Sequence, residues 1–296
     1  MTSFFDEVAR NKIKSFILMF LFIGLFSLIL YFFIVFLGGG LFAFALGFVV
    51  IIAYAAFVYF EGNKVLLIVS GAKLADHKQY HKLYNIIEGL SAASQIKMPK
   101  IYIINDNTPN AFATGRSKKI SSIVVTSGLL NIMNDRELKG VLAHEMSHIY
   151  HNDIQFMMIT VVFAGVIGLI AVVVRNMFFF GFEGGNNRNG GILLLFILVI
   201  GVLGPVFGFL IKMAISRKRE YMADANGARL IRDPIGLANA LKKIKNYSNT
   251  NKRNGNTNEI IAPLYFSNPF SKNSFMNLLS THPPIDERIK RLEKMY

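Results

Sequence analysis

Residues 135–153 read DRELKGVLAHEMSHIYHND. Asp135 is a predicted helix N-cap, and the apolar side chains that follow it recur at helical spacing. They are Leu138, Val141, Leu142 and Met146. The stretch therefore predicts an amphipathic helix that runs on through His148. Residues four apart lie on the same helix face, so the imidazoles of His144 and His148 can reach one metal ion.

Glu145 completes the pattern HExxH, which is the signature of zinc metalloproteases. It lies about 100° round the helix from His144, close enough to contact a metal-bound water without being a ligand. In such sites zinc lowers the pKa of the water and the glutamate takes its proton. A purely structural reading is weak, because an amphipathic helix gains nothing from two histidines beside its apolar stripe. The pattern predicts a zinc enzyme with one Zn²⁺ per chain.

A catalytic zinc site usually has three protein ligands and one open position. The third ligand could be His151, Glu220 or Asp224. His151 shares a face with the first two histidines, but three side chains in one column do not easily complete a tetrahedron. On a second predicted helix, Glu220 would bind zinc and Asp224, one turn on, would accept a hydrogen bond from a ligand imidazole. An exposed acidic pair that balances the basic residues 217–219 explains the same spacing equally well.

The rest of the chain has the composition of a membrane protein. Of its 296 residues 53% are hydrophobic and 17% are charged, which lies outside the usual range for soluble domains. Four stretches contain no charged residue, and each has about the 20 residues that a membrane-spanning helix needs. They are residues 16–37, 41–60, 154–174 and 192–211. The absence of cysteine excludes a disulfide scaffold, and the apolar content excludes a disordered chain.

The predicted fold is a mainly α membrane protein with four transmembrane helices and an α+β zincin-like catalytic domain that carries a small sheet. We expect four consecutive parts: an N-terminal transmembrane hairpin (1–60), a first catalytic part with the HExxH helix (61–153), a second transmembrane hairpin (154–211), and a second catalytic part with the third zinc ligand and a C-terminal helix (212–296). Further helices are predicted at 80–94, 216–231, 234–247 and 285–295, strands at 101–104, 112–116 and 120–125, and a mobile loop at 246–258.

Basic residues are distributed asymmetrically about the four apolar stretches. Both hairpin loops are poor in Lys and Arg, whereas the N-terminus and the segments after Phe60 and Ile211 are rich in them. The positive-inside rule then places both termini and the catalytic domain in the cytosol. The net charge of +14 is accordingly attributed to topology and to anionic lipids in the bilayer, and no nucleic-acid partner is expected.

Several other residues are candidates for the site. The segment Asn110-Ala111-Phe112-Ala113 could be an edge strand that pairs with an extended substrate, or simply a strand after a turn. His282 could donate to the oxyanion or be a removable zinc ligand, or it could be a surface histidine that caps the last helix. Arg288 is a second, weaker candidate for contact with the substrate. Asp153 is expected to orient groups at the foot of the catalytic helix, and His77 and His81 are expected to be surface residues.

Four motifs together resemble the HtpX-type membrane zinc peptidases, which are relatives of the CAAX prenyl proteases. They are PNAFATG, HEMSHIYHND, SRKREYMADANGARL and THPPIDERI, in this order along the chain. The first hairpin and the loop 175–191 are similar to the family only in topology. The resemblance implies zinc bound by His144, His148 and Glu220, with Glu145 as general base and proton shuttle. It also implies an active site that faces the cytosol and a role in membrane-protein quality control.

We therefore expect a zinc endopeptidase in a bacterial cytoplasmic membrane, acting on membrane proteins or unfolded polypeptides. His148 lies six residues before the third apolar stretch, about 9 Å along a helix, so the chemistry would take place near the lipid surface. One rival is a prenyl-protein endopeptidase, against which the small number of spans speaks. Another is a scaffold that binds zinc structurally, against which the intact Glu145 speaks. The sequence predicts neither the native substrates nor the oligomeric state.

Overall fold

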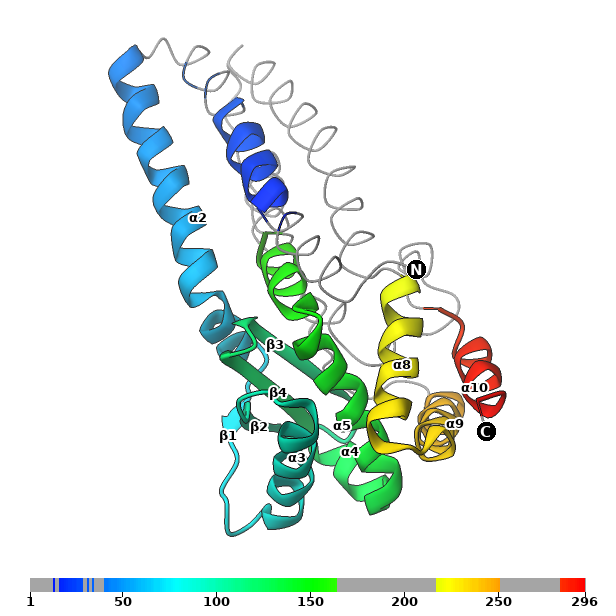
Figure 1. Ribbon diagram of the computed structural model, residues 1–296. Helices are drawn as coiled ribbons and strands as arrows, with labels where there is room; N and C mark the ends of the chain where they lie inside the picture. Colours follow the sequence, from blue (N-terminus) through cyan, green and yellow to red (C-terminus); the bar gives the residue numbers. More distant parts are fainter. Residues whose placement is uncertain are drawn as a thin grey trace, which may run out of the picture.

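A computed structural model of the chain describes residues 16–28, 40–163, 217–250 and 283–295, together with Ile13, Tyr31 and Ile34. The described part is mainly helical and contains a small four-stranded mixed sheet. In Figure 1 the sheet and the helices around it form a body from which the long helix Leu41–Val69 projects on one side. The predicted α+β domain with a small sheet is confirmed in this coarse form.

Helix α2, Leu41–Val69, is the longest helix of the described chain. Among the described residues it is the single helix long and apolar enough to cross a membrane, and most of its apolar stretch is exposed in the protein. It continues past the predicted span, through Glu61 and Lys64, to Val69. Shorter apolar helices cover Phe16–Leu28 and Asp153–Phe163. The remainder of the first and third predicted spans, the whole fourth span and the loop 175–191 lie outside the described residues.

The sheet has the strand order β1-β2-β4-β3. The strands are β1 (Lys73–Leu74), β2 (Lys100–Ile104), β3 (Ala111–Ser117) and β4 (Ile120–Thr126). Strands β2 and β4 are parallel, and the other two pairs are antiparallel. Within the described chain β3 is therefore an edge strand, which was one of the two interpretations of the segment that begins at Asn110.

The two faces of the sheet pack against different layers. Ala113 and Ile123 point into the core that the sheet forms with helices α3 (His81–Ser94), α5 (Asp135–Tyr150) and α9 (Pro234–Thr250). Phe112 and Val124 point to the opposite side, where they pack with the end of α2 and with the helix Asp153–Phe163. Alternating side chains of the sheet thus pack against both layers.

Helix α5 begins one residue earlier than the sequence suggested, because its N-cap is Asn134 and not Asp135. The Asn134 side chain accepts from the Glu137 amide at 2.9 Å, and the Glu137 carboxylate accepts from the Asn134 amide at 2.9 Å. This reciprocal capping box stabilises the start of the helix. Lys243 of α9 adds an ion pair with Glu137 at 2.6 Å. A short helix, α4 (Ser127–Ile132), precedes α5.

Helices α8 (Arg217–Ile231) and α9 cover α5, and α10 (Ile285–Glu293) packs on α9 and α8. The crossings depend on glycine: a Cβ on Gly227 would lie 2.9 Å from the His144 backbone nitrogen, and a Cβ on Gly140 would lie 2.8 Å from the Leu237 nitrogen. Helix α9 runs to Thr250, so the first residues of the predicted loop 246–258 are helical and that part of the prediction is wrong. The rest of that loop lies outside the described residues.

Candidate metal centre

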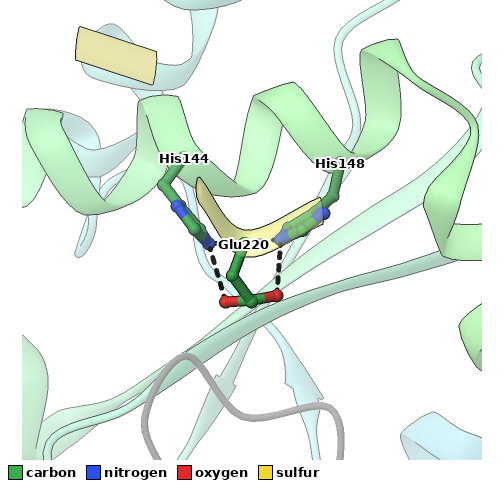
Figure 2. Close-up of side chains that lie close together, drawn as sticks. All are labelled: His144, His148 and Glu220. Carbon is green, nitrogen blue, oxygen red and sulfur yellow. Dashed lines mark hydrogen bonds and ion pairs between the residues drawn. The ribbon is translucent and has the colours of Figure 1, made fainter. Parts of the chain in front are cut away.

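Three side chains from two helices converge between α5 and α8. They are His144 and His148 of α5 and Glu220 of α8, and their potential ligand atoms lie within 4.8 Å of one another. All three are buried. Figure 2 shows the two imidazoles turned towards the carboxylate, with His144 Nε2 3.7 Å and His148 Nε2 3.5 Å from its two oxygens. The two Nε2 atoms are 3.1 Å apart.

These separations of 3.1, 3.5 and 3.7 Å are close to the edges of a zinc coordination tetrahedron. Zinc binds nitrogen and carboxylate oxygen at about 2.0–2.2 Å, which puts two tetrahedral ligands about 3.3–3.6 Å apart. The Nδ1 atoms of both histidines face carboxylates, so in the neutral rings each Nδ1–H donates and each Nε2 presents a lone pair. Two lone pairs and a carboxylate directed at one point favour a cation there. The donor set His, His and Glu is one that zinc prefers.

Two aspartates hold the outer nitrogens of the imidazoles. Asp224 of α8 lies 2.9 Å from His144 Nδ1, and Asp153 lies 3.1 Å from His148 Nδ1. Both carboxylates are buried. Such a contact fixes the tautomer and the orientation of a ligand imidazole.

Arg288 of α10 lies behind the cluster. Its side chain is 2% exposed, and its Nε and Nη2 atoms donate to the two oxygens of Asp224 at 2.8 and 2.7 Å. Its Nη1 atom lies 3.6 Å from Glu220. Contact with a substrate was the role expected from the sequence. Its buried position and its two parallel hydrogen bonds indicate instead that Arg288 holds the carboxylates of Asp224 and Glu220 in place.

Glu145 lies on α5 beside the ligands without joining the cluster of three. Burial raises the pKa of its carboxyl to about 7, although the neighbouring charge of His148 acts in the other direction. The carboxylate also accepts a hydrogen bond from the backbone of Ala113 in β3. The edge strand and the HExxH glutamate are therefore in direct contact, which a sequence separation of about 30 residues does not reveal.

The two histidines differ in their proton affinity. Burial lowers the pKa of His144 to about 4 and outweighs the hydrogen bond to Asp224. Burial acts in the same direction on His148, but the hydrogen bond to Asp153 and the charge of Glu220 outweigh it and raise the pKa of His148 to about 9. The surplus of negative charge around His148 that attracts a proton would equally attract a metal cation.

His151, the alternative third ligand, lies outside the cluster. Its Nδ1 atom lies 2.8 Å from the Ser147 carbonyl oxygen, and its Nε2 atom lies 3.3 Å from the amide nitrogen of Asn226 in α8. The ring therefore links the end of α5 to α8. Neither Asn226 nor the close approach of Gly227 to α5 was singled out from the sequence, since an isolated Asn or Gly on a helix gives no signal for such a contact.

The remaining candidates are placed as follows. His77 and His81 are both exposed, and the His77 ring packs on Tyr84 with centroids 4.5 Å apart. Asn110 is buried and its backbone pairs with Thr126 at the start of β3. His282 lies outside the described residues.

Comparison with known proteins gives three results. Residues 77–296 match the model of Peptidase family M48. A protease HtpX homolog of Caldanaerobacter subterraneus is 42% identical over 98% of this chain and 97% of its own length, and one of Dictyoglomus turgidum is 39% identical over 99% and 95%. The crystal structure of Ste24p from S. mikatae aligns with a TM-score of 0.49 and 21% identity, over 96% of this chain and 66% of that one.

Proposed function

Because the chain belongs to peptidase family M48 and is an HtpX-type membrane zinc metallopeptidase, we propose that it cleaves misfolded or unfolded membrane proteins at the cytosolic face of a bacterial inner membrane. It acts there as an endopeptidase in protein quality control. The observation that carries the proposal is the buried cluster of His144, His148 and Glu220 beside Glu145, a few residues before the apolar helix Asp153–Phe163.

In this proposal one zinc ion is held by His144, His148 and Glu220. When bound, zinc supplies a Lewis acid that lowers the pKa of water and polarises the scissile carbonyl. Asp224 and Asp153 keep the two imidazoles in the tautomer that presents Nε2 to the metal. Arg288 balances the charge of Asp224 and Glu220 and holds the Asp224 carboxylate in one orientation through two hydrogen bonds.

Glu145 is the general base. Its carboxylate takes the proton of the attacking water at Oε and then delivers the same proton to the leaving nitrogen. A carboxyl whose pKa lies near 7 can perform both transfers at neutral pH, because neither the charged nor the neutral form is strongly favoured. The hydrogen bond from Ala113 fixes the side chain with respect to strand β3.

The substrate is an extended polypeptide that pairs with the β3 edge at Asn110 to Ala113. Backbone pairing explains how a protease accepts unfolded segments of many sequences. The contact between Ala113 and Glu145 supports this proposal, because it places the edge next to the base. His282 is proposed to donate a hydrogen bond to the oxyanion of the tetrahedral intermediate.

The position of α5 supports substrates that come from the bilayer. Only His151 and Asn152, which has a positive φ of 61°, separate α5 from the apolar helix Asp153–Phe163. His148 is therefore only six residues from a predicted span. We propose that both hairpins cross the membrane, which gives four spans and a cytosolic catalytic domain.

A reconstitution assay tests the proposal. The zinc-loaded enzyme is placed in nanodiscs together with a destabilised membrane protein that carries an unfolded cytosolic tail, and the variant Glu145→Gln is the matched control. We expect cleavage of the tail by the wild type and none by the variant. Cleavage of soluble casein without cleavage of the membrane-anchored substrate would contradict the quality-control role while leaving the peptidase activity intact.

A further inference from the structure

The hairpin that joins β3 to β4 lies where the membrane helices meet the catalytic domain. The guanidinium carbon of Arg116 is 5.2 Å from the centroid of the Phe60 ring, and Phe60 ends the uncharged part of α2. The ammonium of Lys118 is 4.4 Å from the centroid of Tyr150, the last residue of α5 before the helix Asp153–Phe163. The two cation–π contacts thus fix the hairpin to α2 and to the end of α5.

The contacts of helix α2 show at which level along the helix axis each strand lies. It packs against β3, and Asn63, one turn below Phe60, donates to Ser122 of β4 at 3.4 Å. Three helical residues rise about 4.5 Å, which is close to the 4.7–4.9 Å between neighbouring strands. The strands therefore follow one another along the helix axis, and Figure 1 shows β3 as the strand nearest the projecting part of α2. The edge strand lies level with the end of the apolar span.

The tip of this hairpin carries charges and apolar surface that suit a membrane surface. Lys119 is exposed, and Ile120 beside it is 45% exposed. Within the described part of the chain neither Arg116 nor Lys119 forms an ion pair with a carboxylate. The nearby Glu61 is neutralised by Lys64 at 2.6 Å. Phe60 itself is 58% exposed, so an exposed apolar ring stands beside the Arg116 cation.

We propose that the β3–β4 hairpin, residues 115–120, is a lipid-contacting element that binds anionic phospholipid headgroups of the membrane that holds the protein. Arg116, Lys118 and Lys119 contact the phosphates, and Ile120 inserts between the headgroups. Each basic side chain near an anionic surface contributes about fivefold to the preference for anionic over neutral lipid. The contact holds the β3 edge at the lipid surface, in a plane where polypeptide that leaves the bilayer arrives first.

Labelling tests the position without any use of catalytic activity. The chain has no cysteine, so Ile120→Cys carries a single bimane fluorophore in the full-length protein in nanodiscs. Lys82→Cys on the exposed side of α3, far from the projecting helices in Figure 1, is the control. We expect lipids with a nitroxide near the glycerol backbone to quench the label at residue 120 and not the label at residue 82. Equal quenching at the two positions would overturn the proposal.

Lipid selectivity is tested with the same label by dilute nitroxide-labelled phosphatidylglycerol or phosphatidylcholine in otherwise identical phosphatidylcholine nanodiscs. We expect stronger quenching by phosphatidylglycerol. Lys119→Gln, which is exposed and removes no packing, should reduce this preference about fivefold, and Arg116→Gln/Lys119→Gln should reduce it further. The matched pair Lys78→Gln/Lys82→Gln should leave it unchanged.

Two results would count against the lipid assignment. If Arg116→Gln/Lys119→Gln and Lys78→Gln/Lys82→Gln reduce the preference for phosphatidylglycerol equally, the net charge of the protein and not the hairpin is responsible. If inorganic phosphate in millimolar excess abolishes the preference, the hairpin takes free phosphate and not the membrane surface. If the preference for phosphatidylglycerol persists in phosphate, the hairpin binds the lipid headgroup.

Discussion

Gly227 of α8 lies directly against the backbone of His144 in α5, so that a Cβ added to Gly227 would be 2.9 Å from the His144 nitrogen. Glu220 lies two helical turns before Gly227 on α8. The distance between Glu220 and the two histidines therefore depends on how closely the two helices cross.

We predict that Gly227→Ala separates α5 from α8 and weakens zinc binding. Overpacking of this kind costs about 1–3 kcal/mol of stability. Gly89→Ala in α3 is the matched control, because no atom lies within 4 Å of the Cβ it would add. That change should be neutral or stabilising by up to about 1 kcal/mol. Zinc titration and thermal unfolding of both variants check the prediction, and a zinc affinity unaffected by Gly227→Ala would refute it.

Glu145→Gln should abolish turnover and retain zinc, because the residue acts on water and does not lie among the three ligand atoms. Loss of a general base lowers the rate by about 10² to 10⁴. Metal analysis and casein cleavage on the same preparation measure both properties. Appreciable residual cleavage would exclude Glu145 as the base.

Glu220→Ala should lose zinc severely, whereas Asp224→Asn should weaken zinc binding by about 10- to 100-fold. The first change removes a ligand, whereas the second keeps all three ligands and alters the carboxylate that accepts from the His144 Nδ1–H, at 2.9 Å, and from Arg288. Equilibrium dialysis with zinc compares the variants. His151→Ala is the control: if it released the metal while Glu220→Ala kept it, the ligand assignment would be wrong.

Asp233 should stabilise the protein in a pH-dependent way. The hydrogen bond from Arg136, 2.8 Å from Nη2 to Oδ1, lowers the pKa of this carboxyl. A lowered folded-state pKa stabilises the fold above the unfolded-state pKa of about 3.9, and this stabilisation is lost as the pH falls through the folded-state value.

Asp233→Asn, which keeps an acceptor for the Gly236 amide, should therefore cost up to about 1 kcal/mol at neutral pH and nothing in strong acid. Asp76→Asn is the control, because Asp76 accepts only the Gln79 amide and forms no ion pair within the described residues. Thermal unfolding in detergent across the pH range gives the comparison. An Asp233→Asn effect that persists in strong acid would rule out the ion pair as its cause.

Topology gives the fifth prediction. Single cysteines at Asn187 and Asn254, both outside the described residues, probe the two sides of the membrane in this cysteine-free chain. A membrane-impermeant thiol reagent applied to intact cells should label Asn187→Cys alone. Labelling of Asn254→Cys instead would invert the protein, and labelling of neither would mean that the second hairpin does not cross. Proline kinks or breaks a helix, so Pro205 in the fourth apolar stretch is the reason to test whether the second hairpin crosses the membrane.

Helices and strands whose apolar residues recur at a regular spacing were predictable from the sequence. The helix that contains HExxH, helix α3 and strands β2 to β4 were all expected, because their apolar residues alternate or recur over several turns. Strand β1 has two residues, Lys73 and Leu74, and is too short for a pattern. Helix α2 continues through Glu61 and Lys64 because charged residues end a hydrophobic run without ending a helix.

The site was predictable only in part. The spacing of His144 and His148 puts them on one face within a single helix, and Glu220 and Asp224 share a face for the same reason. Which residues meet across helices is a tertiary property. Arg288 lies 64 residues from Asp224, and although it shares the buried face of α10 with Ile289 and Leu292, that pattern does not indicate which carboxylate it contacts.

The contact of Arg288 with Asp224 also bears on how the enzyme is made. Ribosomes release residue 144 long before residue 288, so the HExxH helix is already synthesised while α10 is still missing. Until α10 docks, the Asp224 carboxylate that faces His144 lacks its buried counter-charge and the two hydrogen bonds that hold it. The support of the metal centre is therefore completed only after α10 has been synthesised and has packed on α8 and α9.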